Sequence, residues 1–118
     1  CRAIRDQKEE RSNSAAKKAM LYIQENYSKD ISLDDVSGLV NISPYYFSKI
    51  FKEETGENFI EYLTKIRIEK AKELLVKPDI SIKEAGIRSG YTDPNYFSRI
   101  FKKQTDMTPS EYKTRYGE

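Results

Sequence analysis

The chain has 118 residues, 34% of them charged, and a formal net charge of only +2 at pH 7. Its length suits one domain or two very small ones, and it contains no apolar run that could span a membrane and no signal segment. Histidine is absent and Cys1 is the only cysteine, which excludes imidazole ligands, an internal disulfide and the usual Ser-His and Cys-His nucleophiles. We therefore expect no enzyme, no cofactor and no metal site, and the lone cysteine favours a reducing, cytoplasmic compartment.

The first part of the chain carries the signals of two helices. Residues 1–13 are polar with mixed charge, and with the non-Met start they predict a linker or the tail of a missing upstream domain, so that the chain is a fragment. The apolar residues over 15–27 form one helical stripe. Ser32 with Asp35 has the form of a capping box, which predicts a short helix over about 33–40.

The same start and stop signals continue to the end of the chain. Ser43 is a suitable N-cap with Pro44 at the first helical position, and Gly56 ends that helix. Asn58 can cap a long helix over about 59–76. Three further helix starts are indicated, by Ser81 with Glu84 as a second capping box, by Asp93 with Pro94, and by Thr108-Pro109 with Glu111. No segment alternates as a strand would, so we expect an all-α fold of about seven helices. Its parts are a linker (1–13), a first helix-turn-helix subdomain (14–57), a connecting helix (58–77) and a second helix-turn-helix subdomain (78–118).

Two segments of the chain are nearly the same. Residues 44–55 read PYYFSKIFKEET and residues 94–105 read PNYFSRIFKKQT. Each follows a short capped helix and a turn, which is the form of a helix-turn-helix. Matching residues upstream of the two segments are one position closer together in the chain than matching residues within them. One copy therefore carries a single-residue insertion in its turn. A repeated helical unit in so short a chain suggests two equivalent contacts on a periodic partner.

The repeated helix has an apolar face and a polar face. The aromatic residues that must pack inward are Phe47, Phe51, Phe97 and Phe101. The opposite face presents hydroxyl, amide and long cationic side chains, which suit a duplex groove because Arg and Lys can donate to guanine and Asn can pair with adenine. Residues later on the two helices are better placed for phosphates, and these are Lys52, Lys102 and Lys103.

Two other interpretations of the polar faces stay open. Polar residues on a single helix are usually no more than a solvated surface, although the repetition of the pattern favours a contact face. A helical protein–protein interaction module is the other alternative, but such a module should expose apolar anchors and only Tyr45 qualifies. The cations of the long helix alternate with glutamates and are expected to face solvent, and these are Lys65, Arg67, Lys70 and Lys72.

Several blocks in series carry a resemblance to a known family. ISPYYFSKIFKEETGENFIEYL, RIEKAKELL and GYTDPNYFSRIFKKQTDMTPSEY closely resemble the DNA-binding domain of AraC-type (AraC/XylS) transcription regulators, over roughly residues 15–116. The resemblance implies two helix-turn-helix subdomains joined by a long central helix, with recognition helices entering two successive major-groove segments of double-stranded DNA. It implies base contacts by Tyr45, Ser48 and Lys49 in the first helix and by Asn95, Ser98 and Arg99 in the second.

The resemblance also predicts the setting of the intact protein. The motifs look most like those of bacterial family members that serve as two-component response regulators. An attached sensing or receiver domain and contact with RNA polymerase are therefore expected of the intact regulator, while the fragment itself is expected to be monomeric.

Two positions depart from the family pattern. Gly86 stands inside a helix where the family usually has Ala, at a cost on the order of 1 kcal/mol in helix propensity. Asp106 stands where the first copy has Gly56, although Asp is less favourable than Gly at a left-handed helix end. We therefore expect a less stable second subdomain, whose docking depends more on DNA.

Overall fold

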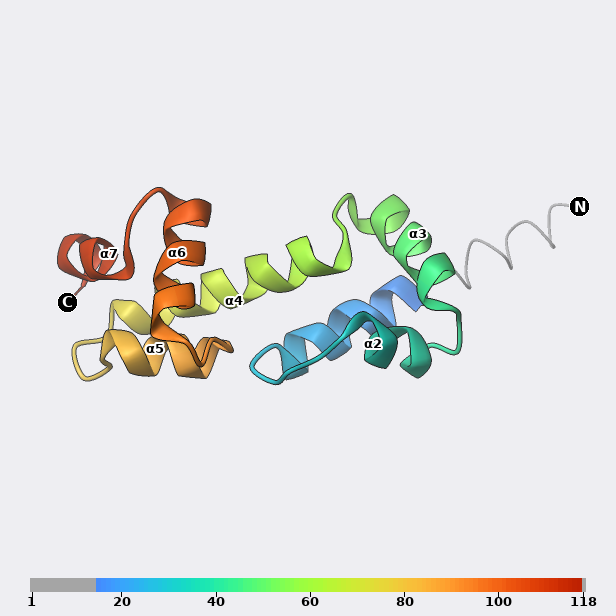
Figure 1. Ribbon diagram of the computed structural model, residues 1–118, viewed down its shortest axis with the longest axis horizontal. Helices are drawn as coiled ribbons and strands as arrows, with labels where there is room; N and C mark the ends of the chain where they lie inside the picture. The colour runs from blue at the N-terminus through green and yellow to red at the C-terminus, as the bar shows by residue number, and fades with distance from the viewer. Residues whose placement is uncertain (1–14, 118) are drawn as a thin grey trace, which may run out of the picture. The chain divides into compact units, whose positions relative to one another are not determined.

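The computed structural model describes residues 15–117, and in that range it contains seven helical segments and no strand (Figure 1). The predicted all-α fold is confirmed. The predicted linker over residues 1–13 lies outside the described residues. After a helical segment over 15–26, the helices are α2 (Leu33–Leu39), α3 (Pro44–Thr55), α4 (Phe59–Leu75), α5 (Ile82–Ser89), α6 (Pro94–Thr105) and α7 (Pro109–Tyr116). None of these described helices is long and apolar enough to cross a membrane.

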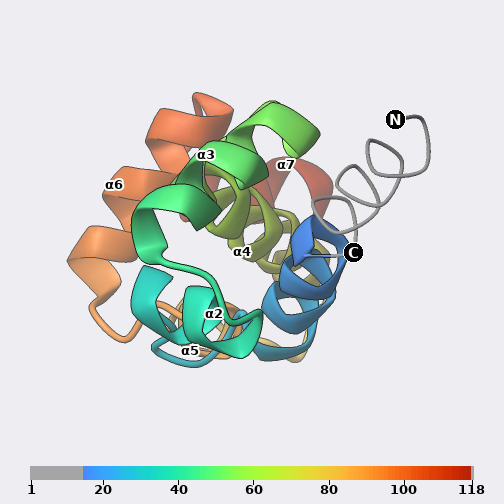
Figure 2. The same cartoon turned by 90° about the vertical axis from the view of Figure 1, so that its right-hand side faces the viewer.

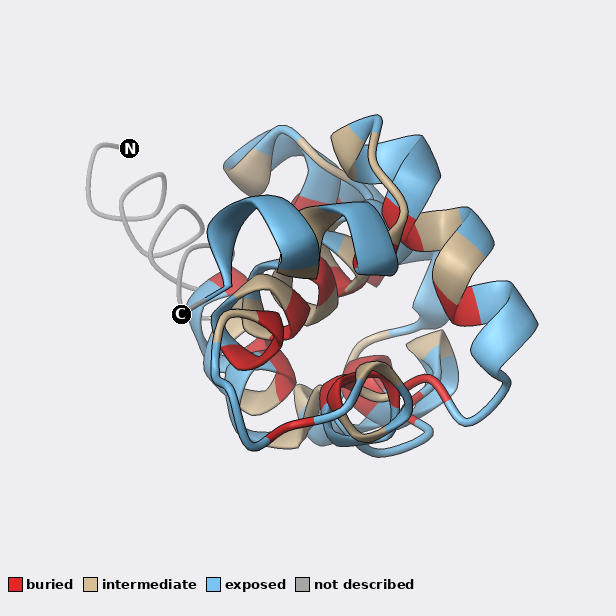
Figure 3. Cartoon of the chain, turned by 90° about the vertical axis from the view of Figure 1, so that its left-hand side faces the viewer, coloured by how far each residue is buried: buried red, intermediate tan, exposed pale blue. Residues whose placement is uncertain are grey.

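The chain divides into two compact units. Unit 1 takes in residues 15–26 and Ile31–Leu63, and unit 2 takes in Tyr27–Asp30 and residues 64–117. Figure 2 looks onto unit 1, where α2 and α3 pack together. Figure 3 looks onto unit 2, where α5, α6 and α7 pack on one another. Buried residues recur among exposed ones along α5 and α6, whereas α7 is buried at its first residue, Pro109.

Each unit has its own apolar core. In unit 1 the buried apolar residues are Ala16, Ala19, Ile23, Ile31, Val36, Phe47, Ile50, Phe51, Phe59 and Leu63. In unit 2 they are Ile68, Ala71, Leu74, Leu75, Ile80, Ala85, Tyr91, Phe97 and Phe101. All four phenylalanines of the repeated helices are at most 1% exposed, so the predicted inward face is confirmed.

Side-chain caps start the helices where the sequence indicates. Ser32 and Asp35 form a reciprocal capping box, with distances of 3.2 and 2.9 Å between backbone nitrogen and side-chain oxygen. Ser81 also caps its helix, by accepting a hydrogen bond from the Glu84 backbone N–H. The predicted second half of that box is wrong, because the Glu84 carboxylate accepts a hydrogen bond from Arg88 Nη2 at 2.7 Å instead. An arginine one turn further along the helix offers the carboxylate a charged partner.

Arg67 on α4 does not face solvent as expected. Its Nε donates to the Tyr27 carbonyl at 2.7 Å, and its Nη2 donates to the Lys29 carbonyl at 3.0 Å. Its guanidinium carbon also lies 5.3 Å from the centre of the Tyr91 ring. Arginine supplies several donors in one plane, so it can hold two loop carbonyls while it stacks on an aromatic ring. Arg67 is therefore a structural residue of unit 2.

Gly86 has a packing role that the sequence does not reveal. A Cβ built at Gly86 lies 2.9 Å from Cδ2 and 3.1 Å from Cγ of the buried Phe97 ring. The missing side chain thus lets the ring of α6 approach the backbone of α5. Close packing on Phe97 therefore gives a physical reason for glycine at this position, and the lower stability expected of the second subdomain stays a prediction.

Alanine substitutions should separate these two effects. We expect Gly86→Ala to lower the free energy of unfolding by about 1 kcal/mol, because overpacking costs about 1–3 kcal/mol against about 1 kcal/mol gained in helix propensity. Gly38 on α2 is the matched control, since a Cβ there meets no atom within 4 Å. Gly38→Ala should raise the stability by up to about 1 kcal/mol. Urea unfolding measures both, and equal stabilisation by the two changes would contradict the packing role.

Candidate nucleic-acid interface

The two repeated helices are seated in their units by the same aromatic contacts. In unit 1 the Phe51 ring meets the Tyr62 ring edge-on, with centroids 5.3 Å apart. In unit 2 the Phe101 ring meets the Tyr112 ring edge-on at 5.5 Å. Because these rings fix the inward face of α3 and of α6, each helix presents its opposite face away from its own core.

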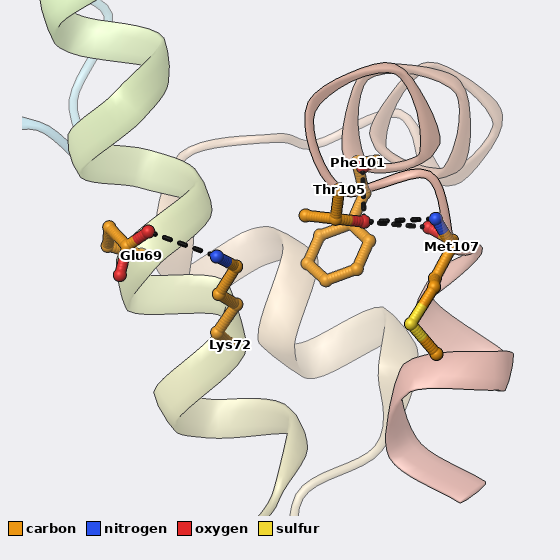
Figure 4. A network of polar contacts seen from close by, with 5 residues as sticks. All are labelled: Glu69, Lys72, Phe101, Thr105 and Met107. Carbon is orange, nitrogen blue, oxygen red and sulfur yellow. Dashed lines mark hydrogen bonds and ion pairs between the residues drawn. The ribbon is translucent and has the colours of Figure 1, made fainter. Parts of the chain in front are cut away.

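The ends of the two helices are also held alike. Thr55 Oγ1 donates to the Phe51 carbonyl at 2.7 Å and lies 2.9 Å from the Glu57 carbonyl. Thr105 Oγ1 lies 2.8 Å from the Phe101 carbonyl and 3.0 Å from the Met107 carbonyl, as Figure 4 shows. The following residue adopts a left-handed conformation in both units, with φ of 82° at Gly56 and 65° at Asp106. Asp106 thus adopts the left-handed conformation that the sequence predicts at the end of this helix.

The outward faces of α3 and α6 hold the predicted contact residues. Those that are exposed are Tyr45, Lys49, Lys52, Asn95, Arg99, Lys102 and Lys103. Tyr45 has 84% of its surface exposed, more than any other large hydrophobic residue in the described range. Ser48 and Ser98 are half-buried, at the edge between the outward face and the core. The structure therefore brings each predicted set together on one helix, and their contacts with DNA stay a prediction.

The cations of the outward faces differ from those elsewhere in the fold. On α4 and α5, ion pairs join Lys70 to Glu73 (3.4 Å), Lys72 to Glu69 (3.1 Å) and Arg88 to Glu84 (2.7 Å), and Figure 4 includes the second of these pairs. Over residues 15–117, no such pair involves the cations of α3 and α6, which are Lys49, Lys52, Arg99, Lys102 and Lys103. These five side chains remain available to an external anion.

Sequence reasoning missed the aromatic cluster behind the start of α6. Tyr91 is 6% exposed, and its ring lies 5.8 Å from Phe97 and 5.7 Å from Tyr96. Burial raises the pKa of the Tyr91 hydroxyl, while the nearby Arg67 guanidinium and a hydrogen bond with Thr64 act in the opposite direction. The only sequence signal for this cluster is that an aromatic residue, Tyr91, follows Gly90 in the turn. The cluster itself is recognised from the contacts that Tyr91 makes with α4 and α6 in the structure.

The two capped helix pairs, each with a polar and cationic second helix, define a protein of the helix-turn-helix class. A family model described as a helix-turn-helix domain matches residues 36–115. The chain belongs to this family, in the form found in AraC/XylS-type regulators. The resemblance drawn from the sequence motifs is thereby confirmed.

Individual relatives agree with this assignment. The regulatory protein PocR of Salmonella typhimurium is 37% identical over 106 residues, which are 90% of this chain and 35% of PocR, so the chain spans about a third of that protein. The C-terminal domain of AraT, a response regulator from Geobacillus stearothermophilus, has 40% identity and a TM-score of 0.85 over 88% of this chain and 87% of that chain. The C-terminal domain of the two-component response regulator YesN from Fusobacterium nucleatum has 34% identity and a TM-score of 0.80 over 85% and 98%.

Proposed function

We propose that this chain is the DNA-binding part of a bacterial transcription regulator and that α3 and α6 each enter a major-groove segment of double-stranded DNA. The observation that carries the proposal is the pair of identically seated helices whose outward cations have no ion-pair partner within residues 15–117. Unneutralised Lys and Arg side chains on a helix of this class suit the phosphates and base edges of a duplex. No catalytic role is proposed for any residue.

The roles of the contact residues follow from their chemistry. The proposed base contacts are Tyr45, Ser48 and Lys49 on α3, and Asn95, Ser98 and Arg99 on α6. Arg99 has the planar fork that fits guanine O6 and N7, and Asn95 can pair with adenine. The proposed phosphate contacts, which give affinity without sequence preference, are Lys52, Lys102 and Lys103.

The intact protein is proposed to be a response regulator. Its relatives AraT and YesN are response regulators, and their matching parts are C-terminal domains. We infer that a receiver domain controls this DNA-binding part, that the intact regulator contacts RNA polymerase, and that the chain acts as a monomer in the cytoplasm.

Selection of bound duplexes from a random library tests the proposal directly. We expect enrichment of two short boxes about ten base pairs apart, because recognition helices on one face of the duplex meet successive major-groove segments one turn apart. Retention on heparin that is lost with salt provides a rapid first check. A library without enrichment and without salt-dependent retention would instead support a protein–protein interaction module.

The two matched lysines should contribute to affinity for any sequence. We expect Lys52→Ala and Lys102→Ala each to weaken binding to cognate and scrambled duplexes about equally and to reduce the salt slope by about one unit. Titrations over a range of salt concentrations measure both effects. If either change altered preference at one base pair, that lysine would read a base and its assignment to phosphate would be wrong.

A further inference from the structure

Matched positions of α3 and α6 carry opposite charges. Glu53 in α3 stands where α6 has Lys103, and Glu54 stands where α6 has Gln104. Consequently α3 (Pro44–Thr55) has two cations and two acids, whereas α6 (Pro94–Thr105) has three cations and no acid. The two repeated helices therefore offer very different electrostatic surfaces to the same partner.

The helices are seated alike where these charges differ. Glu53 lies two residues before Thr55 and Lys103 lies two residues before Thr105, and both threonines make the same pair of contacts with backbone carbonyls. Glu53 and Lys103 are both exposed, and neither has an ion-pair partner within residues 15–117. The charge reversal thus occurs at one geometric position and is not neutralised inside the fold.

The neighbouring cation experiences opposite surroundings in the two helices. Glu53 follows Lys49 by four residues, and Lys103 follows Arg99 by four residues. Side chains four residues apart lie on the same face of a helix. Glu53 therefore weakens the positive potential around Lys49, while Lys103 strengthens it around Arg99.

The same imbalance extends over the two units. The described part of unit 1 contains four Lys and Arg against seven Asp and Glu, a net charge of −3. The described part of unit 2 contains thirteen against eight, a net charge of +5. The small net charge of the whole chain hides this difference.

We propose that the two helices have unequal roles on DNA: α6 supplies most of the affinity for phosphates in addition to its base contacts, and Glu53 makes the docking of α3 depend on matching bases. This inference rests on the proposed function. A carboxylate near the duplex backbone repels phosphate, so α3 gains little from a wrong sequence, and only its base contacts offset the repulsion. A repulsion that is equal on every duplex cancels in the ratio of two affinities, so the effect of Glu53 is expected in the docking of α3 on a mismatched duplex and not in that ratio.

Exchanging the charges between the two helices tests the proposal. The first variant, Glu53→Lys with Glu54→Gln, gives α3 the charges of α6. The reciprocal variant, Lys103→Glu with Gln104→Glu, gives α6 the charges of α3. Glu25→Lys is the control, because it replaces the same acid by the same cation as Glu53→Lys does, at an exposed residue outside both helices. Binding to a selected duplex and to a mixed-sequence duplex is measured over a range of salt concentrations, and circular dichroism checks folding.

We expect the first variant to bind the mixed-sequence duplex more tightly, with a salt slope on that duplex steeper by about one unit. The reciprocal variant should bind both duplexes more weakly, with a slope shallower by about one unit. Glu25→Lys should leave the mixed-sequence affinity and the salt slope at the parental values.

Three results would overturn the inference while leaving the proposed function intact. The first is an unchanged slope and an unchanged mixed-sequence affinity in the first variant, and the second is an equal effect of Glu25→Lys. The third is a changed preference at one base pair with unchanged mixed-sequence binding, which would mean that Glu53 accepts a hydrogen bond from a cytosine. A parent protein that binds neither duplex would refute the proposed function and this inference with it.

Discussion

Gly90→Ala is expected to lower the free energy of unfolding by about 2–5 kcal/mol. Gly90 ends α5 with φ of 111°, where a residue with a Cβ pays about 1–2 kcal/mol of backbone strain. A Cβ there would also lie 2.7 Å from Arg67 Nε and 2.8 Å from the Tyr27 carbonyl oxygen. Those two atoms are hydrogen-bonded to each other, so neither can move away without loss of that bond, and overpacking adds about 1–3 kcal/mol.

Gly56 provides the matched control for this prediction. It ends α3 with φ of 82°, but a Cβ there meets no atom within 4 Å. Gly56→Ala should therefore cost only the backbone strain, about 1–2 kcal/mol. Chemical unfolding followed by circular dichroism compares the two variants, and equal losses of stability would show that the contacts of Arg67 and Tyr27 do not constrain Gly90.

Local signals were enough to predict most of the fold. The caps at Ser32, Ser43 and Thr108 each act on a backbone group three residues away, so their effect can be predicted from a short stretch of sequence. The inward faces of α3 and α6 follow from helical spacing alone, and the repeat shows the same spacing of apolar residues in both helices. The predicted contact residues share one face for the same reason.

Contacts between distant segments were beyond such signals. Arg67 lies forty residues from Tyr27, and nothing near Arg67 in the sequence distinguishes it from the solvated lysines of α4. Gly86 costs helix propensity locally, and the reason for a glycine there is the ring of Phe97, which belongs to another helix and leaves no room for a Cβ. The Glu84 carboxylate could accept a hydrogen bond either from the Ser81 backbone N–H or from the Arg88 guanidinium, and in the structure it accepts from Arg88.

Arg99→Ala is expected to cost about 1–3 kcal/mol on the cognate duplex and to relax preference at one position of its box. Arg99 is exposed on α6, opposite the buried Phe97, and it has no ion-pair partner within residues 15–117. It lies in the N-terminal half of the helix, which recognition helices commonly present to base edges. The loss of its two donors leaves guanine O6 and N7 without partners.

The lysine variant separates the charge of Arg99 from its shape. Arg99→Lys keeps a cation at the same exposed position but replaces the fork of two donors by a single flexible ammonium group. We therefore expect it to keep the parental salt slope and still to lose preference at the same base pair. Lys49→Ala should act on the other box, less sharply, because a lysine reads guanine without the bidentate geometry. If Arg99→Ala, folded by circular dichroism, bound cognate and scrambled duplexes with the parental affinity ratio, Arg99 would have no part in base recognition.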